Sequence, residues 1–323
     1  MKAIRVHDVG GPEVLRWEDV TVGEPGPGEA RIRHSAVGLN FVDVYYRTGL
    51  YKAPALPFTP GSEGAGVVEA VGAGVADVKP GMRVAYGAAP LGAYSQARLV
   101  PADTLVPVPD GIDDRTAAAM MLKGMTAHYL LLRIGRIQKG DTILFHAAAG
   151  GVGLIACQWA RALGATVIGT VGSDEKAELA RAHGCEHPIV YTRERFVDRV
   201  KEITGGKGVK IVYDSVGKDT LLGSVDCLQL LGTVALFGQS SGPVPPFDLS
   251  LLARGSRFIT RPSLFHYVAA RPDLLAAARA LFDVVLSGAV KVEVRQTYPL
   301  SEASRAHRDL EARKTVGSTV LLP

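Results

Sequence analysis

The spacing of apolar and polar residues divides the chain into two parts with different rhythms. As far as about Leu122, short apolar segments are separated by turns rich in Gly and Pro. Segments of this kind predict β-strands. We expect strands at Ala3–His7, Glu29–Ser35, Gly64–Val71 and Arg83–Tyr86. The first part is therefore predicted to form a compact, β-rich domain.

Beyond Gly124 the pattern changes to strands that alternate with helices. Val152, Ile155, Trp159 and Leu163 recur on one helical stripe, and Gly164 stands just after it, which predicts a helix over 152–163. Because a parallel connection needs a crossover helix, such alternation predicts a doubly wound parallel sheet of the Rossmann type. The other expected elements are helices at Asp174–His183, Glu194–Thr204 and Thr220–Leu231, and strands at Thr142–His146, Thr166–Val171, Ile189–Tyr191, Val209–Asp214 and Thr233–Phe237.

The last part of the chain follows a loop at 239–246. Its pattern predicts helices at Asp273–Ser287 and Ser301–Ala312 and a final strand at Ser318–Leu322. This strand fits either sheet, and the pattern alone does not choose between them. A chain of 323 residues exceeds the usual size of one domain, so we expect an α/β protein of two domains with a cleft between them.

Charge and cysteine content narrow the class of protein. The net charge is only +4, and no dense Lys/Arg run is interleaved with aromatic residues, so no nucleic acid partner is expected. Asp8 and Glu13 lie where a signal peptide needs apolar residues, and no apolar run is long enough for a membrane span. Three widely spaced cysteines, Cys157, Cys185 and Cys227, argue for a reducing compartment. We expect a cytoplasmic protein.

The turn at 147–153, Ala-Ala-Ala-Gly-Gly-Val-Gly, carries the main functional signal. It joins a predicted strand to a predicted helix, whose free N–H groups and dipole favour an anion. The spacing matches the dinucleotide fingerprint G-x-G-x-x-G, with Ala148 in place of the first glycine, Gly150 as the second and Gly153 as the third. As a bare sequence string the match is weak, but its position between a predicted strand and a predicted helix strengthens it. A turn that binds nothing remains the alternative, whereas the glycines of Gly61–Gly74 precede no helix and indicate β structure.

The end of the next strand indicates which dinucleotide binds. NAD-preferring sites usually carry an acidic residue there, but residues 170–173 read Thr-Val-Gly-Ser. Ser173 can donate a hydrogen bond to a 2′-phosphate, Lys176 can supply positive charge, and Tyr191 ends the following strand nearby. NADPH is therefore favoured over NADH. Ser173 also suits the N-cap of the next helix, with two acidic residues in the first turn, and the two roles are compatible.

Several segments together resemble the zinc-free bacterial quinone oxidoreductases of the medium-chain dehydrogenase/reductase superfamily, which are similar to zeta-crystallin. The resemblance covers essentially the whole chain and implies a GroES-like catalytic domain formed by 1–123 and 264–323, a Rossmann NADPH-binding domain at 124–263, NADPH:quinone oxidoreductase activity and a homodimer. The segments are FHAAAGGVGLIACQWARALGATVIGTVGS, GLNFVDVYYRTGLY, LKGMTAHYLL, IVYDSVGKDT, LFGQSSG and ITRPSLFHY.

The resemblance also implies roles for individual residues. Asn40 would position groups near the nicotinamide, and Tyr45 and Tyr51 would supply aromatic walls and hydroxyl donors to the acceptor. Tyrosines that merely pack against a helix are the alternative, and Lys123 and Asp43 are equally compatible with a structural ion pair. The implied cofactor contacts are Asn40, Asp43, Tyr129, Gly150, Gly151, Val152, Gly172, Ser173, Lys176, Tyr191, Ser215, Phe237, Gly238, Ser240 and Ser263.

No metal is expected at this site. Zinc alcohol dehydrogenases of the superfamily carry a Cys ligand near the position of Asn40 and a His in a Gly-His-Glu motif, where this chain has Gly61-Ser62-Glu63. The remaining residues do not supply a tetrahedral N/S site. Without a Lewis acid, the suitable chemistry is hydride transfer from the nicotinamide to an electron-poor acceptor.

Three functions stay open from the sequence. The first is an NADPH-dependent quinone reductase that works in a zinc-independent cleft between the two domains. The second is a reductase of α,β-unsaturated carbonyls, which differs in its acceptor and in needing a proton donor for carbon. The third is a non-catalytic NADPH-binding structural or RNA-binding protein, because the resembling family also contains lens proteins and RNA binders. The low net charge disfavours RNA binding.

Overall fold

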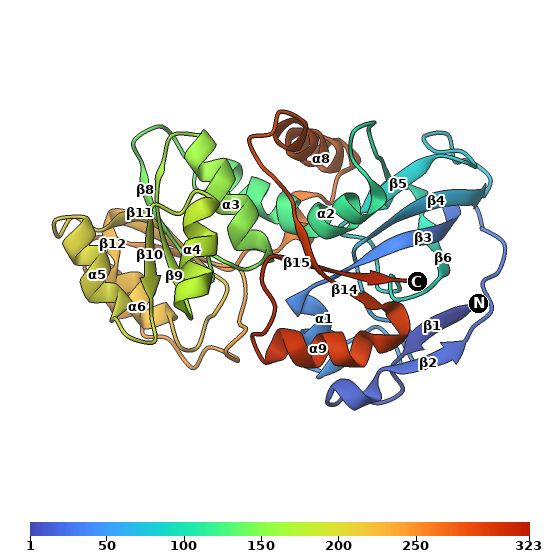
Figure 1. The fold of residues 1–323 in the computed structure, drawn as a ribbon, viewed down its shortest axis with the longest axis horizontal. Helices are drawn as coiled ribbons and strands as arrows, with labels where there is room; N and C mark the ends of the chain where they lie inside the picture. The colour runs from blue at the N-terminus through green and yellow to red at the C-terminus, as the bar shows by residue number, and fades with distance from the viewer. The chain divides into compact units, whose positions relative to one another are not determined.

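The computed structural model describes residues 1–323 and divides the chain into two compact units (Figure 1). Unit 1 consists of Met1–Met125, Val268–Leu286 and Val292–Pro323. Unit 2 consists of Thr126–Tyr267 and Ser287–Lys291. The chain thus leaves unit 1 to form unit 2, returns at Val268 and enters unit 2 once more at Ser287–Lys291, so that both termini belong to unit 1.

Unit 2 is built on a six-stranded sheet in which all neighbouring strands are parallel. The strand order is β10-β9-β8-β11-β12-β13, which becomes 3-2-1-4-5-6 when the strands are counted from β8. This is the doubly wound order, and the predicted α/β class is confirmed. The strands are β8 Thr142–Phe145, β9 Thr166–Val171, β10 His187–Val190, β11 Val209–Asp214, β12 Leu228–Leu236 and β13 Phe258–Thr260.

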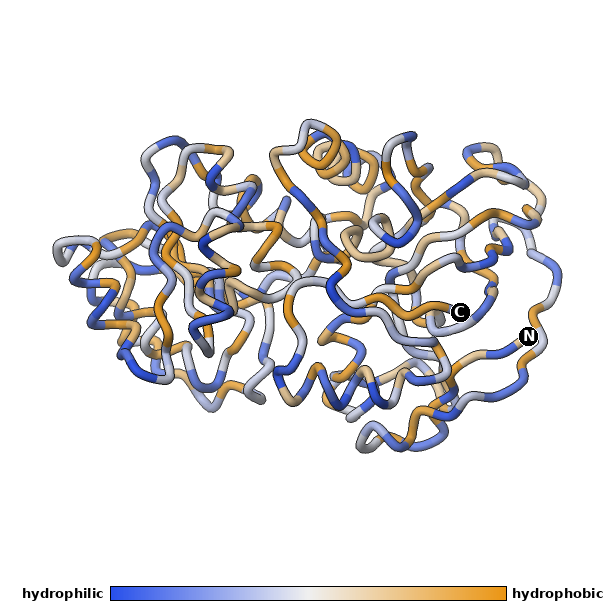
Figure 2. The backbone as a smooth tube through the Cα atoms, in the orientation of Figure 1, coloured by the Kyte–Doolittle hydropathy of each residue, from blue (hydrophilic) through white to orange (hydrophobic).

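Helices connect these strands and cover the sheet. Right-handed crossovers place α3 (Gly151–Ala162) and α4 (Asp174–Ala182) on one face and α5 (Phe196–Ile203) and α6 (Leu221–Asp226) on the other. Apolar side chains of α5 and α6 share one buried cluster with those of the strands. Figure 2 shows hydrophobic residues along the central strands of the unit, and most residues of β8, β9 and β11 are buried, as is typical of a parallel sheet with helices on both faces.

Unit 1 contains a two-stranded and a seven-stranded sheet. The larger one has the path β14-β15-β3-β4-β5-β7, with β6 paired to β3, and is antiparallel except where β14 pairs β15. The C-terminal strand β15 therefore joins this sheet and settles the question left open by the sequence. The strands are β1 Lys2–Arg5, β2 Arg16–Asp19, β3 Glu29–Leu39, β4 Gly64–Val71, β5 Arg83–Tyr86, β6 Ala97–Pro101, β7 Val106–Pro107, β14 Val294–Pro299 and β15 Ser318–Leu322.

The remaining helices lie mostly in unit 1, and no helix of the chain combines the length and apolar character needed to cross a membrane. Helix α2 begins in unit 1 and ends in unit 2, where a π-helical turn, η3, continues it. The α-helices are α1 Phe41–Arg47, α2 Asp114–His128, α7 Leu264–Tyr267, α8 Arg271–Leu286 and α9 Ala303–Glu311. The π turn is η3 Tyr129–Ile134, and the 3₁₀ turns are η1 Pro12–Val14, η2 Ala102–Thr104, η4 Leu249–Ala253 and η5 Leu300–Glu302.

One predicted helix was wrong in its C-terminal half, and two observed helices were missed. The predicted helix at 220–231 ends at Asp226, and Leu228 already pairs with Val209 of β11; its apolar leucines suited a helix, but sheet pairing overrode that preference. Helices α1 and α2 were not predicted. In α2, consecutive residues from Ala117 to Met121 are all buried, so no amphipathic stripe marks the helix in the sequence.

Candidate functional site

The cofactor residues predicted in unit 2 gather at one edge of the parallel sheet. Apart from Tyr129, each follows the carboxyl end of a strand, where doubly wound sheets bind ligands. Strand order reverses between β8 and β11, next to the glycine turn. The residues are Gly150, Gly151 and Val152 after β8, Gly172, Ser173 and Lys176 after β9, Tyr191 after β10, Ser215 after β11, Phe237, Gly238 and Ser240 after β12, and Ser263 after β13.

The glycine turn needs a small residue at Gly153. A Cβ atom there would lie 2.4 Å from the carbonyl oxygen of Ala147 and 2.6 Å from that of Ala148. At the position of the first glycine of the fingerprint, Ala148 is buried and its N–H donates to the carbonyl of Thr170 at 3.0 Å. Gly150 stands at the N-cap of α3 and is not buried. The first N–H groups of α3 therefore form a small, accessible anion site.

No acidic residue stands at the end of β9, where Val171 is followed by Gly172 and Ser173. A Cβ atom on Gly172 would lie 3.0 Å from the hydroxyl oxygen of Tyr191, so the tyrosine closes over the glycine backbone. Ser173 accepts the N–H of Lys176 at 3.3 Å, which confirms its N-cap role. The nearby Asp174 forms a two-pronged ion pair with Arg193 at 2.7 and 2.6 Å, which offsets the negative charge of this helix start.

A buried aspartate shapes the loops beside Ser215. Asp214, at the end of β11, accepts hydrogen bonds from two backbone N–H groups and from the hydroxyl groups of Thr220 and Ser224. Ser240 donates its N–H to the carbonyl of Ser215 at 3.1 Å. The loops after β11 and β12 are thus fastened to each other. Sequence reasoning missed Asp214 as a structural residue of the site; its signal was an acidic residue directly after the apolar run Ile211–Tyr213.

His146 extends this network to the glycine turn. Its Nε2 lies 3.0 Å from the Ser224 hydroxyl and its Nδ1 lies 2.9 Å from that of Thr170. Burial lowers the pKa of His146, so the imidazole is neutral and bridges β8 and β9 to α6 by hydrogen bonds. The residue directly before the turn is therefore held on both sides, which keeps the turn in place.

Tyr129 does not follow a strand but stands at the start of η3. Its ring stacks on that of Tyr267, with centroids 4.5 Å apart and an angle of 9° between the planes. Burial raises the pKa of the Tyr129 hydroxyl, which therefore stays protonated. A π turn at this point is notable because such turns are frequent at functional sites.

The predicted residue Asn40 is held by a buried ion pair in unit 1. Its Nδ2 donates to Oε2 of Glu63 at 2.7 Å, and Nζ of Lys123 lies 2.8 Å from the same oxygen. The backbone N–H of Leu122 donates to Oε1 at 2.7 Å. Glu63 is fully buried. The suggested pairing of Lys123 with Asp43 was therefore wrong: the partner is Glu63, which sequence reasoning missed.

Asp43 supports Asn40 from within α1. Its Oδ2 accepts the backbone N–H of Asn40 at 2.9 Å and the hydroxyl of Tyr94 at 3.0 Å, whereas its Oδ1 is buried without a hydrogen-bond partner. Burial raises the pKa of Asp43 to about 7. The carboxyl group of Asp43 thus binds the backbone N–H of the N-cap residue at the start of α1. It is also one of the few groups near Asn40 that would titrate near neutral pH.

Tyr45 and Tyr51 lie in one aromatic cluster at the end of α1. Their ring centroids are 5.1 Å apart, and those of Phe41 and Tyr45 are 5.5 Å apart. The N–H of Tyr51 donates to the carbonyl of Tyr45 at 2.9 Å, so the segment after α1 folds back onto the helix. This geometry is compatible with tyrosines that only pack against the helix and also with tyrosines that bind the acceptor.

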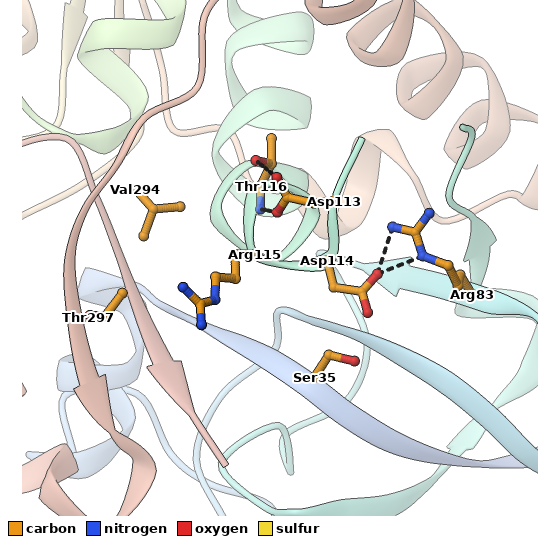
Figure 3. A pocket seen from close by; sticks show the side chains of 8 residues that line it. All are labelled: Ser35, Arg83, Asp113, Asp114, Arg115, Thr116, Val294 and Thr297. Atoms are coloured by element: carbon orange, nitrogen blue, oxygen red, sulfur yellow. Dashed lines mark hydrogen bonds and ion pairs between the residues drawn. The ribbon is translucent and has the colours of Figure 1, made fainter. Parts of the chain in front are cut away.

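No group of three or more His, Cys, Asp or Glu side chains is arranged to hold a metal ion. A hollow of about 730 Å³ in unit 1 includes none of the predicted site residues (Figure 3). Its lining is mostly charged or polar, unlike that of most small-molecule sites, and consists of Ser35, Arg83, Asp113, Asp114, Arg115, Thr116, Val294 and Thr297.

Comparison with known proteins identifies the family. Residues 26–110 match the alcohol dehydrogenase GroES-like domain and residues 151–278 match the zinc-binding dehydrogenase domain. Over 323 residues, 100% of this chain and 99% of the relative, the sequence is 53% identical to a quinone oxidoreductase of Pseudomonas aeruginosa. This chain belongs to the quinone oxidoreductase family. The expected resemblance and the GroES-like and Rossmann architecture are confirmed.

Other members of the family cover the chain equally well. A 2-haloacrylate reductase of Burkholderia sp is 50% identical over 325 residues, with 98% of each chain covered. The solved structure of Escherichia coli quinone oxidoreductase, which is a complex with NADPH, superposes with a TM-score of 0.98 at 48% identity and covers 100% of both chains. Quinone oxidoreductases and a reductase of a different acceptor are thus comparably similar to this chain.

Proposed function

We propose that this quinone oxidoreductase family member is an NADPH-dependent quinone reductase. The observation that carries the proposal is the acid-free end of β9, where Gly172 and Ser173 precede Lys176 at the carboxyl edge of a doubly wound sheet. The NADPH complex of the Escherichia coli relative supports the same cofactor.

The residues of unit 2 fit a phosphorylated dinucleotide. Only a residue without a side chain leaves room at Gly153, and the adjoining N–H groups of α3 suit a pyrophosphate. Ser173 and Lys176 would hold the 2′-phosphate, with Tyr191 beside them over Gly172. When bound, the nicotinamide supplies a hydride to the acceptor.

The residues of unit 1 would orient the acceptor and the reactive ring. Glu63 and Lys123 fix the amide of Asn40 so that its orientation does not depend on solvent. Tyr45 and Tyr51 would offer ring faces to a planar acceptor and hydroxyl protons to its oxygen. These three residues carry the proposed catalytic positioning.

A second candidate is reduction of α,β-unsaturated carbonyls. The observation that favours it is the 50% identity to a 2-haloacrylate reductase over nearly the whole chain. In that reaction the hydride forms a new C–H bond at the β-carbon and a proton is added at the α-carbon. The site would then need a proton donor near carbon, whereas a reduced quinone can take its protons on oxygen from water.

Turnover with a panel of acceptors decides between these functions. The purified protein would be mixed with NADPH and with benzoquinones, naphthoquinones, enones or 2-haloacrylate, and NADPH oxidation would be followed at fixed pH. Faster turnover of quinones supports the first proposal and faster turnover of enones the second. NADPH binding without turnover of any acceptor rejects both and leaves a non-catalytic role. NADH in parallel tests the cofactor preference.

We further propose that the protein is a cytoplasmic homodimer. The edge strand β13 has a neighbour on one side only, and Phe258 on it and Leu230 near it are 56% and 75% exposed. An exposed parallel edge with apolar neighbours favours pairing with a second copy. Light scattering on the purified protein should give twice the chain mass, and the mass of a single chain would reject the dimer.

The odd number of widely spaced cysteines in the chain supports the proposed cytoplasmic location.

A further inference from the structure

A buried chain of polar groups runs from the C-terminal helix α9 to helix α1. The carboxylate of Glu311 forms a two-pronged ion pair with Arg47 at 2.8 Å for both contacts. Nη1 of Arg47 lies 3.2 Å from Nδ1 of His307, and Nε2 of His307 lies 3.1 Å from the hydroxyl oxygen of Tyr94. The Tyr94 hydroxyl lies 3.0 Å from Oδ2 of Asp43. All but Glu311 are buried.

The chemistry of the partners sets the direction of every hydrogen bond in this chain. A guanidinium group has donors and no acceptor, so Nδ1 of His307 must accept from Arg47. Burial and the charge of Arg47 lower the pKa of His307 to about 3. The single proton of the neutral imidazole is therefore assigned to Nε2, which donates to Tyr94. The Tyr94 hydroxyl is then left to donate to Asp43.

This direction determines where Asp43 can hold a proton. Its Oδ2 already accepts two hydrogen bonds, from the Tyr94 hydroxyl and from the backbone N–H of Asn40. Its Oδ1 is buried and has no partner. A proton added to Asp43 must therefore sit on Oδ1, and its presence weakens Oδ2 as the acceptor that holds Asn40 at the start of α1.

We propose that Asp43 is a positioning residue for Asn40 and that its protonation adjusts the geometry of the proposed reductase site. The chain from Arg47 through His307 directs the Tyr94 hydroxyl to Asp43 and so contributes to that protonation state, which brings the C-terminal helix α9 into the site without contact to a ligand. This inference rests on the proposed NADPH-dependent function and extends it to the residues that control Asn40.

The charged and titratable groups around Asp43 favour this role. Burial opposes ionisation of Asp43 most strongly, and the charge of Glu63 adds to this effect. The N–H of Asn40, the hydroxyl of Tyr94 and the charge of Lys123 of α2 stabilise the carboxylate. Tyr46 of the same helix also senses the charge of Asp43. These opposing influences leave the carboxyl group able to change state near neutral pH, whereas most buried carboxylates are locked in one form.

Two variants and a matched control test the inference. Asp43→Asn removes the titratable proton but keeps the shape, and Tyr94→Phe removes one hydrogen bond to the carboxylate. Tyr298→Phe is the control, because the Tyr298 hydroxyl also bonds an aspartate, Asp309, at 2.9 Å in the same unit but outside the site. For each protein, the NADPH dissociation constant and kcat/KM would be measured from pH 5 to 9.

We expect the wild type to show an ionisation in both profiles. In Tyr94→Phe its midpoint moves upward by at least half a pH unit, because the carboxylate has lost a donor. In Asp43→Asn the ionisation disappears, and Tyr298→Phe matches the wild type. An unchanged midpoint in a folded Tyr94→Phe variant, or a wild-type profile in Asp43→Asn, overturns the inference. If Tyr94→Phe does not fold, Asp43→Asn alone decides.

A stability measurement separates this inference from the proposed function. The pKa of Asp43 is raised by burial from 3.8 to about 7, so the native state holds a proton that the unfolded chain loses between these values. Asp43 therefore costs stability as the pH rises through this range, and Asp43→Asn should gain stability relative to the wild type over it. This result supports the inference even if no acceptor is reduced. A constant difference between the two proteins overturns it.

Discussion

Nδ2 of Asn40 lies 2.7 Å from Oε2 of Glu63 in a part of unit 1 from which water is excluded. The same carboxylate carries the ion pair with Lys123, so one buried charge both orients the amide and neutralises the ammonium group. A buried pair of this kind contributes little net stability, but its loss leaves an uncompensated charge. The arrangement therefore ties the geometry of Asn40 to the stability of the unit.

Glu63→Gln is expected to destabilise the protein strongly. The substitution leaves the buried ammonium of Lys123 without its counter-charge, and we expect a loss of about 3–5 kcal/mol in the free energy of unfolding. Urea unfolding followed by fluorescence measures it. The control is Glu302→Gln, which breaks a 2.9 Å pair with Arg305 on the surface and should cost less than about 1 kcal/mol. Equal losses in the two variants would contradict the prediction.

Lys176→Ala is expected to weaken NADPH binding selectively. A charged hydrogen bond to the 2′-phosphate is worth about 1.5–3 kcal/mol, so the dissociation constant of NADPH should rise about ten- to hundredfold while that of NADH stays nearly constant. Titrations of protein fluorescence with each nucleotide measure both constants. Lys207→Ala is the matched control, because Lys207 is exposed just before β11, at the opposite edge of the sheet. A parallel loss for both nucleotides would reject the role of Lys176.

Gly153→Ala is expected to disrupt the glycine turn. The new methyl group would meet two backbone oxygens within 2.6 Å, and backbone atoms cannot yield as a flexible side chain can. We expect a loss of about 1–3 kcal/mol in stability or in NADPH affinity, measured by thermal unfolding and nucleotide titration. Gly23→Ala is the control, since no heavy atom lies within 4 Å of its added Cβ. Wild-type affinity and stability in Gly153→Ala would show that the turn is not tightly packed.

Buried histidines are expected to make the protein sensitive to acid. Burial lowers the pKa of His34 to about 4 and that of His307 to about 3. Below pH 6.5 these two histidines are protonated in the unfolded chain but remain neutral in the native state. Each histidine therefore lowers the free energy of unfolding by roughly 1.4 kcal/mol per pH unit as the pH falls towards its native pKa. Above pH 6.5 this loss of stability is absent. The unfolding free energy thus rises with pH because of the histidines, whereas it falls with pH because of Asp43.

Substitution of His34 tests this acid sensitivity. His34→Gln should lower the slope of unfolding free energy against pH by up to about 1.4 kcal/mol per unit between pH 6.5 and 4. The control is His266→Gln, because His266 is exposed. Urea unfolding at several pH values measures the slopes. A His34→Gln slope equal to that of the wild type would contradict the assignment.

Short-range sequence patterns were enough to predict individual strands and turns, because these elements depend mainly on residues close together in the chain. Strands such as Gly64–Val71 and Thr166–Val171 were predicted with the bounds that the structure has, because apolar segments cut by Gly and Pro fold alike in most contexts. The predicted order of strand, turn and helix around 147–153 is also observed, since the turn lies between β8 and α3, and its small residues stand in one short segment.

Tertiary structure alone decided the contacts between residues distant in the chain. The sequence does not show that Lys123 pairs with Glu63 and not with Asp43, that β15 lies between β14 and β3, or that α9 reaches Asp43 through Tyr94. Such contacts depend on the burial and register of whole elements, which no local pattern encodes. The sequence thus determined where the small-residue turn between β8 and α3 lies, and packing determined which buried charges hold Asn40 beside α1.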